Sequence, residues 1–127
     1  MEISEKRRMR KVEIKKLRNA IEFIRGAVFN DIAIGQLVMF LYVADHEGVT
    51  QPELSEALEM SQGAVSRNCA KLSTKIVPKS LSASLGNKYE DRGYNLIEQR
   101  QDSIDSRRKA LFLTELGRLI VEKLRKI

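Results

Sequence analysis

The sequence predicts a mainly α fold with a small β-hairpin (α+β), a winged helix-turn-helix. Residues 50–72 have the pattern of two short helices joined by a tight turn, and residues 94–113 have that of two strands around a charged turn. A length of 127 residues suits a single domain over residues 1–127. We therefore expect one winged-helix DNA-binding domain, in which the hairpin forms the wing beside the second helix of the pair.

Residues 1–28 predict a long first helix. Its apolar positions alternate by three and four and so share one side. These positions are Ile14, Leu17, Ile21, Ile24 and Val28. Lys and Arg crowd the first half, so we interpret the segment as a dimerisation helix whose basic start reaches DNA. The alternative is an ordinary amphipathic helix packed on its own domain, since two heptads are too few for a free-standing coiled coil.

Two more helices are expected before and after the DNA-binding elements. Gly35 to His46 is almost wholly apolar, which predicts a buried core helix that ends before Gly48. Thr114 is a suitable N-cap for a last helix over residues 114–127. We expect the first and last helices to form a homodimer interface.

The helix pair at residues 50–72 is defined by its caps. Thr50 can cap the first helix, with Glu53 completing a capping box, and Ser61 can cap the second after a break at residues 59–60. Glutamates at positions 53, 56 and 59 make the first helix acidic. Its outer face is therefore expected to point away from DNA phosphates.

The second helix of the pair has one apolar and one polar side. Val65, Cys69 and Leu72 recur at helical spacing and predict the buried side. The outer side suits a DNA major groove, where Arg67 can bond guanine and Gln62 can bond adenine. We assign DNA contacts to Gln62, Gly63, Ser66, Arg67 and Lys71. The alternative is a pair of amphipathic helices that pack within any small helical domain.

Residues 73–93 predict a loop between the helix pair and the wing. Pro78, Gly86 and Gly93 interrupt a stretch rich in serine and lysine. Its cations are candidates for further phosphate contacts: Lys75, Lys79, Lys88 and Arg92. The alternative is a surface excursion without such a role.

The predicted wing carries three adjacent cations. Asp and Ser residues at positions 102–106 favour a turn, and Arg107, Arg108 and Lys109 follow directly. Cations held this close repel one another, which is tolerable when the partner is a polyanion. Asp105 is well placed to brace one of the arginines. The alternative is a solvated hairpin whose charges keep the protein soluble.

Composition agrees with an acidic partner. The net charge is +6 and the pI is about 9.6, and nucleic acid is the commonest acidic partner. We expect no membrane contact, because no run of about 18 apolar residues exists to span a bilayer. With no signal peptide of the usual form, the expected location is cytoplasmic and nucleoid-associated.

The residues give little support for catalysis. His46 lies near a helix end, where it can cap carbonyls, and Cys69 is interpreted as a small core residue, with a redox role as the alternative. No phosphate-binding loop or nucleophile motif is present, and one His and one Cys cannot make a zinc site without several carboxylates. We expect no enzyme activity, no cofactor and no metal. No residue set identifies a small-molecule effector.

Two strings resemble the MarR family of transcriptional regulators. The wing string D-x-x-D-x-R-R-K-x-L-x-L-T-x-x-G spans Asp102 to Gly117, and TQPELSEAL and SQGAVSRNCAKL resemble the family's helix-turn-helix. The resemblance covers about residues 38–124 and implies a symmetric dimer on palindromic DNA. It places Gln62, Gly63, Ser66 and Arg67 in the major groove. It places Arg107 in the minor groove, supported by Asp105 and Arg108.

The chain departs from the family pattern at two places. Residues 73–93 form an insertion before the wing, and the last helix is shorter than is usual in the family. We predict a sequence-specific, double-stranded DNA-binding transcriptional regulator, a repressor that acts as a homodimer. The alternatives are a non-specific architectural or replication-associated DNA-binding protein and a winged helix used as a protein-interaction module.

Overall fold

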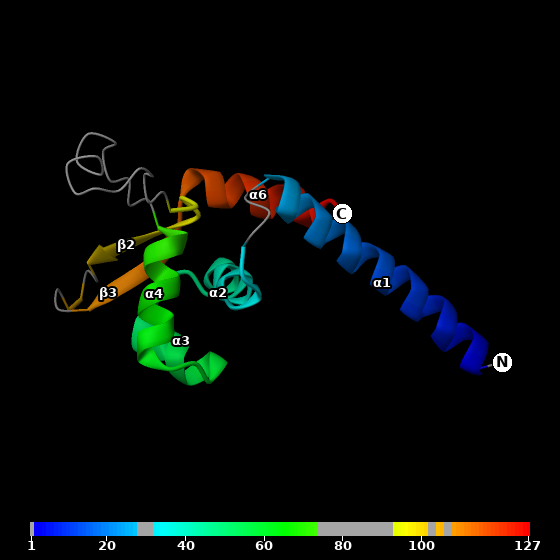
Figure 1. The fold of residues 1–127 in the computed structure, drawn as a ribbon, viewed down its shortest axis with the longest axis horizontal. Helices are drawn as coiled ribbons and strands as arrows, with labels where there is room; N and C mark the ends of the chain where they lie inside the picture. The colour runs from blue at the N-terminus through cyan, green and yellow to red at the C-terminus, as the bar shows by residue number, and fades with distance from the viewer. Residues whose placement is uncertain (1, 28–31, 74–92, 102–103, 106–107) are drawn as a thin grey trace, which may run out of the picture.

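The computed structural model describes residues 2–27, 32–73, 93–101, 104–105 and 108–127 (Figure 1). Most of the predicted loop at residues 73–93, with its four cations, and the wing residue Arg107 lie outside the described residues. The elements follow in the order α1 (Glu2–Ala27), α2 (Ile34–Asp45), β1 (Val49–Thr50), α3 (Gln51–Leu58), α4 (Gln62–Leu72), β2 (Ile97–Gln101), β3 (Lys109–Leu113) and α6 (Glu115–Arg125). The predicted class, mainly α with a small β-hairpin, is confirmed.

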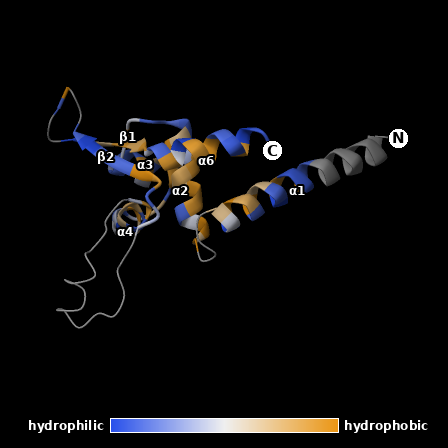
Figure 2. Cartoon of the chain, turned by 90° about the horizontal axis from the view of Figure 1, so that it is seen from above, coloured by the Kyte–Doolittle hydropathy of each residue, from blue (hydrophilic) through white to orange (hydrophobic). Residues whose placement is uncertain are grey.

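The long helix α1 projects from the rest of the chain (Figures 1 and 2). Its C-terminal part contacts α6, and Ile24 is buried there. Nearer the N-terminus the apolar side is open to solvent, since Ile14 and Leu17 are 64% and 61% exposed. In the described part of α1, most of the predicted apolar side therefore has no cover from the chain itself.

Helix α2 is the core helix that the apolar run predicts. Met39, Phe40 and Val43 are fully buried. At its start, the backbone N–H of Ala33 donates to the Gln36 side chain at 3.0 Å. Beyond its end, Gly48 adopts a φ of +96°, which is a left-handed conformation that favours glycine and lets the chain turn into β1.

Helices α3 and α4 are capped by the two hydroxyls that the sequence indicates. Thr50 Oγ1 accepts the N–H of Glu53 at 3.3 Å, and Ser61 Oγ accepts the N–H of Ala64 at 3.1 Å. The predicted capping box takes another form, because the Glu53 carboxylate accepts the Thr50 hydroxyl at 3.0 Å. Helix α3 ends at Leu58, and its C-cap Glu59 has a φ of +52° and opens the short turn into α4.

The three strands form an antiparallel sheet in the order β1-β3-β2. The predicted hairpin pairs Ile97 with Leu113 at its base and Gln101 with Lys109 toward its tip. The edge strand β1 was not predicted, and its Thr50 lies opposite Ala110. Since α3 follows β1 directly, the wing is joined to the helix-turn-helix through backbone pairing.

After residues 74–92 the chain docks on the end of α4. The N–H groups of Tyr94 and Leu96 donate to the carbonyls of Lys71 and Leu72, each at 2.8 Å. These bonds satisfy carbonyls that the helix end would leave unpaired. A β-carbon at Gly93 would overlap the Ser73 carbonyl, so this close approach requires glycine.

A single hydrophobic core joins α2, α3, α4, the sheet and α6. Its members are Met39, Phe40, Val43, Val49, Leu54, Val65, Cys69, Leu72, Tyr94, Leu96, Ile97, Leu111, Leu113 and Ile120. Because both α4 and the hairpin contribute to this core, α4 and the wing are held by the same packing.

Candidate nucleic-acid interface

Helix α4 is anchored along the side that the sequence predicts. Val65, Cys69 and Leu72 are fully buried, and residues 62 and 63 begin the helix directly after the Ser61 cap. Burial of one side fixes the rotation of the helix about its axis. The opposite side is therefore presented to solvent as a stable surface.

The solvent side of α4 is small and polar. Gln62, Gly63, Ser66 and Arg67 are all exposed. A β-carbon at Gly63 would lie 3.4 Å from Arg67 Nη1, so the guanidinium of Arg67 lies back along the helix over this glycine. The result is an exposed face with one cation, two further hydrogen-bonding side chains and no bulky group, which suits entry into a DNA major groove.

Lys71 lies at the edge of this face. Its side chain is half-buried, and its ammonium lies 5.2 Å from the centre of the Tyr94 ring, a cation–π contact. The lysine therefore links the end of α4 to the returning chain, and the DNA contact that the sequence predicts for it stays a prediction.

The described wing residues show a backbone turn and an ion pair. The N–H of Arg108 donates to the carbonyl of Asp105 at 3.0 Å, so Asp105 supports the turn through its backbone. The guanidinium of Arg108 pairs with Glu53 at the start of α3. Lys109, the first residue of β3, is exposed. The predicted minor-groove residue, Arg107, lies outside the described residues.

Two hollows connect the outer side of α4 to the wing. One hollow is lined by Gln51, Pro52, Gln62 and Ser66. The other is lined by Thr50, Gln51, Pro52, Gln99, Arg108 and Lys109. Because the two hollows share Gln51 and Pro52, the start of α3 forms the bridge between them. Predicted residues from α4 and from the wing are thereby brought onto one continuous surface.

Sequence reasoning missed three residues of this surface. Gln51 and Pro52 lie within the helix pair predicted at residues 50–72, and Gln99 lies within the predicted wing, but none of the three was assigned to DNA binding. Arg100 was missed as well: it pairs with Glu98 at 2.5 Å and lies over the Phe112 ring at 4.8 Å. The available signal was alternation along β2, which turns residue 99 to one face of the hairpin and residue 100 to the other.

The surroundings of Cys69 and His46 indicate a structural role for each residue. Burial raises the pKa of the Cys69 thiol from 9.0 to about 11 by desolvation, so the thiol is protonated at neutral pH. His46 Nδ1 lies 3.3 Å from the Tyr42 carbonyl, the capping position that the sequence indicates, and its ring stacks on Tyr42.

Within the described ranges, no group of three or more His, Cys, Asp and Glu side chains gathers around a possible metal position. Among the described helices, none is long and apolar enough to cross a membrane.

A buried helix-turn-helix followed by a hairpin on the same core defines a winged helix-turn-helix protein. The resemblance to the MarR family is confirmed, since the model of that family matches residues 31–75. This match contains α2 and the whole helix-turn-helix. The wing and the two outer helices lie beyond it, and for them the comparison rests on structure.

Solved MarR-type structures share the fold over most of the chain. A complex of S. aureus MepR with DNA has a TM-score of 0.57 and 22% identity, over 93% of this chain and 79% of that one. A mutant of S. aureus MepR bound to an oligodeoxyribonucleotide gives 0.58 and 22%, over 96% and 74%. Wild-type MarR from E. coli in its apo form gives 0.54 and 21%, over 94% and 73%. No curated protein matches the chain by sequence. The chain thus has the winged helix-turn-helix fold of the MarR family.

Proposed function

We propose that the chain is a sequence-specific, double-stranded DNA-binding transcriptional regulator that acts as a repressor and as a homodimer. The observation that carries the proposal is the continuous surface from α4 across the start of α3 to the wing. A protein that reads DNA needs groups for base edges and groups for phosphates on one surface. Here Gln62 and Ser66 share that surface with Arg108 and Lys109.

Each residue of the surface has a proposed part in binding. Gln62, Ser66 and Arg67 read base edges in the major groove, and the missing side chain of Gly63 lets the backbone come close. Lys71 and Lys109 bind phosphates, which supplies affinity without sequence preference. Arg107 enters the minor groove beside the wing, with Asp105 and Arg108 as its supports. Two of the structures that share the fold hold DNA, which supports this assignment.

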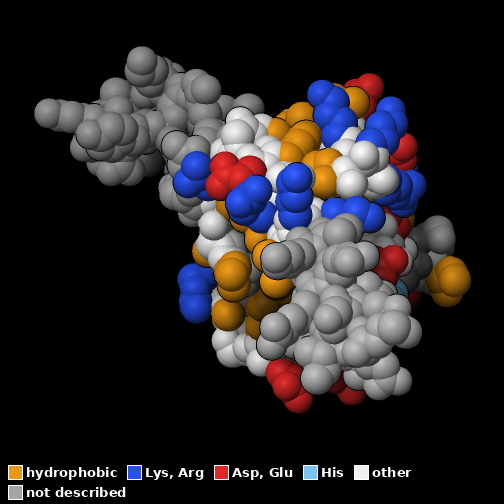
Figure 3. All heavy atoms as spheres, turned by 90° about the vertical axis from the view of Figure 1, so that its right-hand side faces the viewer, with side chains coloured by type: hydrophobic (Ala, Val, Ile, Leu, Met, Phe, Trp, Pro, Cys, Tyr) orange, Lys and Arg blue, Asp and Glu red, His pale blue; other side chains and the backbone are white. Residues whose placement is uncertain are grey.

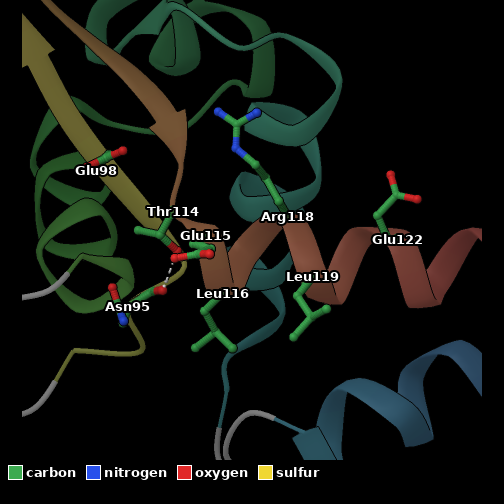
Figure 4. Close-up of a pocket in the computed structure, with 8 residues that line it drawn as sticks. All are labelled: Asn95, Glu98, Thr114, Glu115, Leu116, Arg118, Leu119 and Glu122. Atoms are coloured by element: carbon green, nitrogen blue, oxygen red, sulfur yellow. Dashed lines mark hydrogen bonds between the residues drawn. The ribbon is translucent and has the colours of Figure 1, made fainter.

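The homodimer is proposed from the apolar side chains that one chain leaves open on α1 and α6. Leu17 is 61% exposed and Leu119 is 54% exposed, and Leu116 projects from the same side of α6 as Leu119 (Figure 4). Figure 3, viewed from the side toward which α1 projects, shows apolar side chains open to solvent beside Lys and Arg. Two contacting helices whose apolar sides are left half-covered by one chain are typical of a subunit interface.

A hollow beside α6 also supports the proposed homodimer. It is lined by Asn95, Glu98, Thr114, Glu115, Leu116, Arg118, Leu119 and Glu122, which include apolar groups and charges of both signs. In Figure 4, Leu116 and Leu119 project from one side of α6, and Arg118 and Glu122 project from the other. Thr114 fixes one end of this surface, because its hydroxyl donates to the Asn95 carbonyl at 2.6 Å. A hollow of this composition suits a helix from a second copy, which carries both apolar and charged side chains.

Selection of bound duplexes from a random DNA pool tests the proposed function. The wild-type chain is expected to enrich a palindromic consensus. The Arg67→Ala variant is expected to select a less specific consensus, and the Arg107→Ala variant is expected to bind the consensus more weakly. Arg125→Ala serves as the matched control, because Arg125 is an exposed arginine on the last turn of α6, paired with Glu122. Binding without enrichment would support the architectural role, and no binding to duplex DNA would support a protein-interaction module.

A further inference from the structure

Arg108 and Glu53 join the wing to the helix-turn-helix by an ion pair across 55 positions of the sequence. Arg108 immediately precedes β3, and Glu53 lies on the first turn of α3. Each side chain is about half exposed, at 50% and 51%. The contact therefore lies at the surface, on the side of α3 that faces the wing.

The Glu53 carboxylate is held in position by hydrogen bonds with Thr50. Its Oε1 accepts the Thr50 hydroxyl at 3.0 Å, while Thr50 Oγ1 accepts the Glu53 N–H at 3.3 Å. Thr50 itself is 4% exposed and is paired in the sheet opposite Ala110. Since a buried residue of the sheet holds the carboxylate, Arg108 meets an acceptor with a fixed position.

The ion pair restrains a part of the wing that the sheet does not. Backbone pairing between β1 and β3 ends at Thr50 and Ala110, and pairing between β2 and β3 ends at Gln101 and Lys109. Arg108 lies beyond both ends, so its contact with α3 is made past the last strand pair. Helix α3 in turn packs on α4.

We infer that Glu53 is a positioning residue for DNA binding, which holds Arg108 and so fixes the wing relative to the recognition helix. This inference rests on the proposed function. A protein that contacts two neighbouring grooves gains affinity when the two contact regions are ordered before binding, because less ordering is required in the complex. Glu53 has no part in contacting DNA and acts through Arg108.

Electrostatics alone makes the opposite prediction. A carboxylate beside a DNA-binding surface repels phosphates, so its neutralisation should strengthen binding. Glu56, an exposed carboxylate further along the same helix, supplies the matched control. Glu53→Gln and Glu56→Gln remove the same charge from α3. The glutamine at position 53 keeps an oxygen that can accept the Thr50 hydroxyl, so the start of α3 is preserved.

The test measures dissociation constants of the full chain for its selected duplex by fluorescence anisotropy. Glu53→Gln is expected to weaken binding about two- to fivefold, as the loss of an exposed ion pair would predict, while Glu56→Gln leaves binding unchanged or tighter. In the Arg108→Gln background, Glu53→Gln is expected to have no further effect. Equal effects of the two glutamate substitutions, or additive effects at positions 53 and 108, would overturn the inference.

A second measurement needs no DNA. In NMR relaxation of the side-chain Nε–H of Arg108, the wild-type chain and Glu56→Gln are expected to show a restrained guanidinium, and Glu53→Gln a mobile one. Equal mobility in all three proteins would show that Glu53 does not restrain Arg108 and would overturn the inference. Failure of the wild-type chain to bind any duplex would instead overturn the proposed function, and the relaxation data keep these two failures distinguishable.

Discussion

Gly117, in the first turn of α6, faces the carbonyl oxygen of Leu96 so closely that a β-carbon at position 117 would overlap it. The same oxygen accepts the N–H of Thr114 at 3.0 Å. Thr114 Oγ1 also accepts the N–H of Gly117 at 3.0 Å, which caps the helix. The last helix is thus seated backbone to backbone on the chain that enters the wing. This contact gives a physical reason for the glycine that ends the wing string.

Gly117→Ala is therefore expected to destabilise the fold. A methyl group would have to displace backbone, so we expect the free energy of unfolding to fall by about 1–3 kcal/mol. Urea denaturation followed by circular dichroism measures it. Gly26→Ala is the control, because a β-carbon there meets nothing within 4 Å and alanine favours a helix. A Gly117→Ala protein as stable as the control would contradict the tight contact.

Lys109→Gln is expected to lower the salt dependence of DNA binding. Each cation that neutralises a phosphate contributes about 0.9 to the slope of log K against log salt concentration, so the slope should fall by about that amount. Anisotropy titrations over a range of salt concentrations measure it. Lys126→Gln, at the exposed end of α6, removes the same charge away from the proposed surface. Equal slopes for the two variants would remove Lys109 from the phosphate contacts.

Local chemistry explains why much of the fold could be predicted from the sequence. Thr50, Ser61 and Thr114 each cap the helix that follows them, because a cap bonds an N–H only three residues away. The buried side of α4 also follows from spacing alone, since Val65 and Cys69 are one turn apart. The hairpin is signalled by its turn formers and by the apolar run that follows the cations.

Contacts between distant segments could not be predicted in the same way. The edge strand β1 has two residues, too few to show alternation, and its place depends on Leu111 and Ala110 far along the chain. Glu53 was interpreted as an acid turned away from phosphates, because nothing in its neighbourhood indicates Arg108. The roles assigned to the DNA-binding residues stay predictions, and Arg107 among them lies outside the described residues.

Leu17→Gln is expected to weaken the proposed homodimer. In a symmetric dimer the substitution acts in both chains, and each buried leucine contributes about 1.5–3 kcal/mol, so the dimer dissociation constant should rise at least about tenfold. Sedimentation equilibrium measures the dissociation constant. Arg18→Gln changes the neighbouring residue, which is also exposed in the single chain. Leu17 would have no part in the interface if both variants associated like the wild type.

Cys69 is expected to make stability depend on pH in the alkaline range. The folded state keeps the thiol proton up to a pKa of about 11, whereas the unfolded state loses it near 9.0, so the folded state binds more protons between these values. The stabilisation is therefore complete below pH 9 and is lost as pH rises toward 11, by up to about 3 kcal/mol. Urea unfolding over this pH range is therefore compared with that of Cys69→Ala, in which this part of the loss should vanish. The same burial should protect the native thiol from alkylation at neutral pH, and rapid alkylation without unfolding would contradict the assignment of Cys69 to the core.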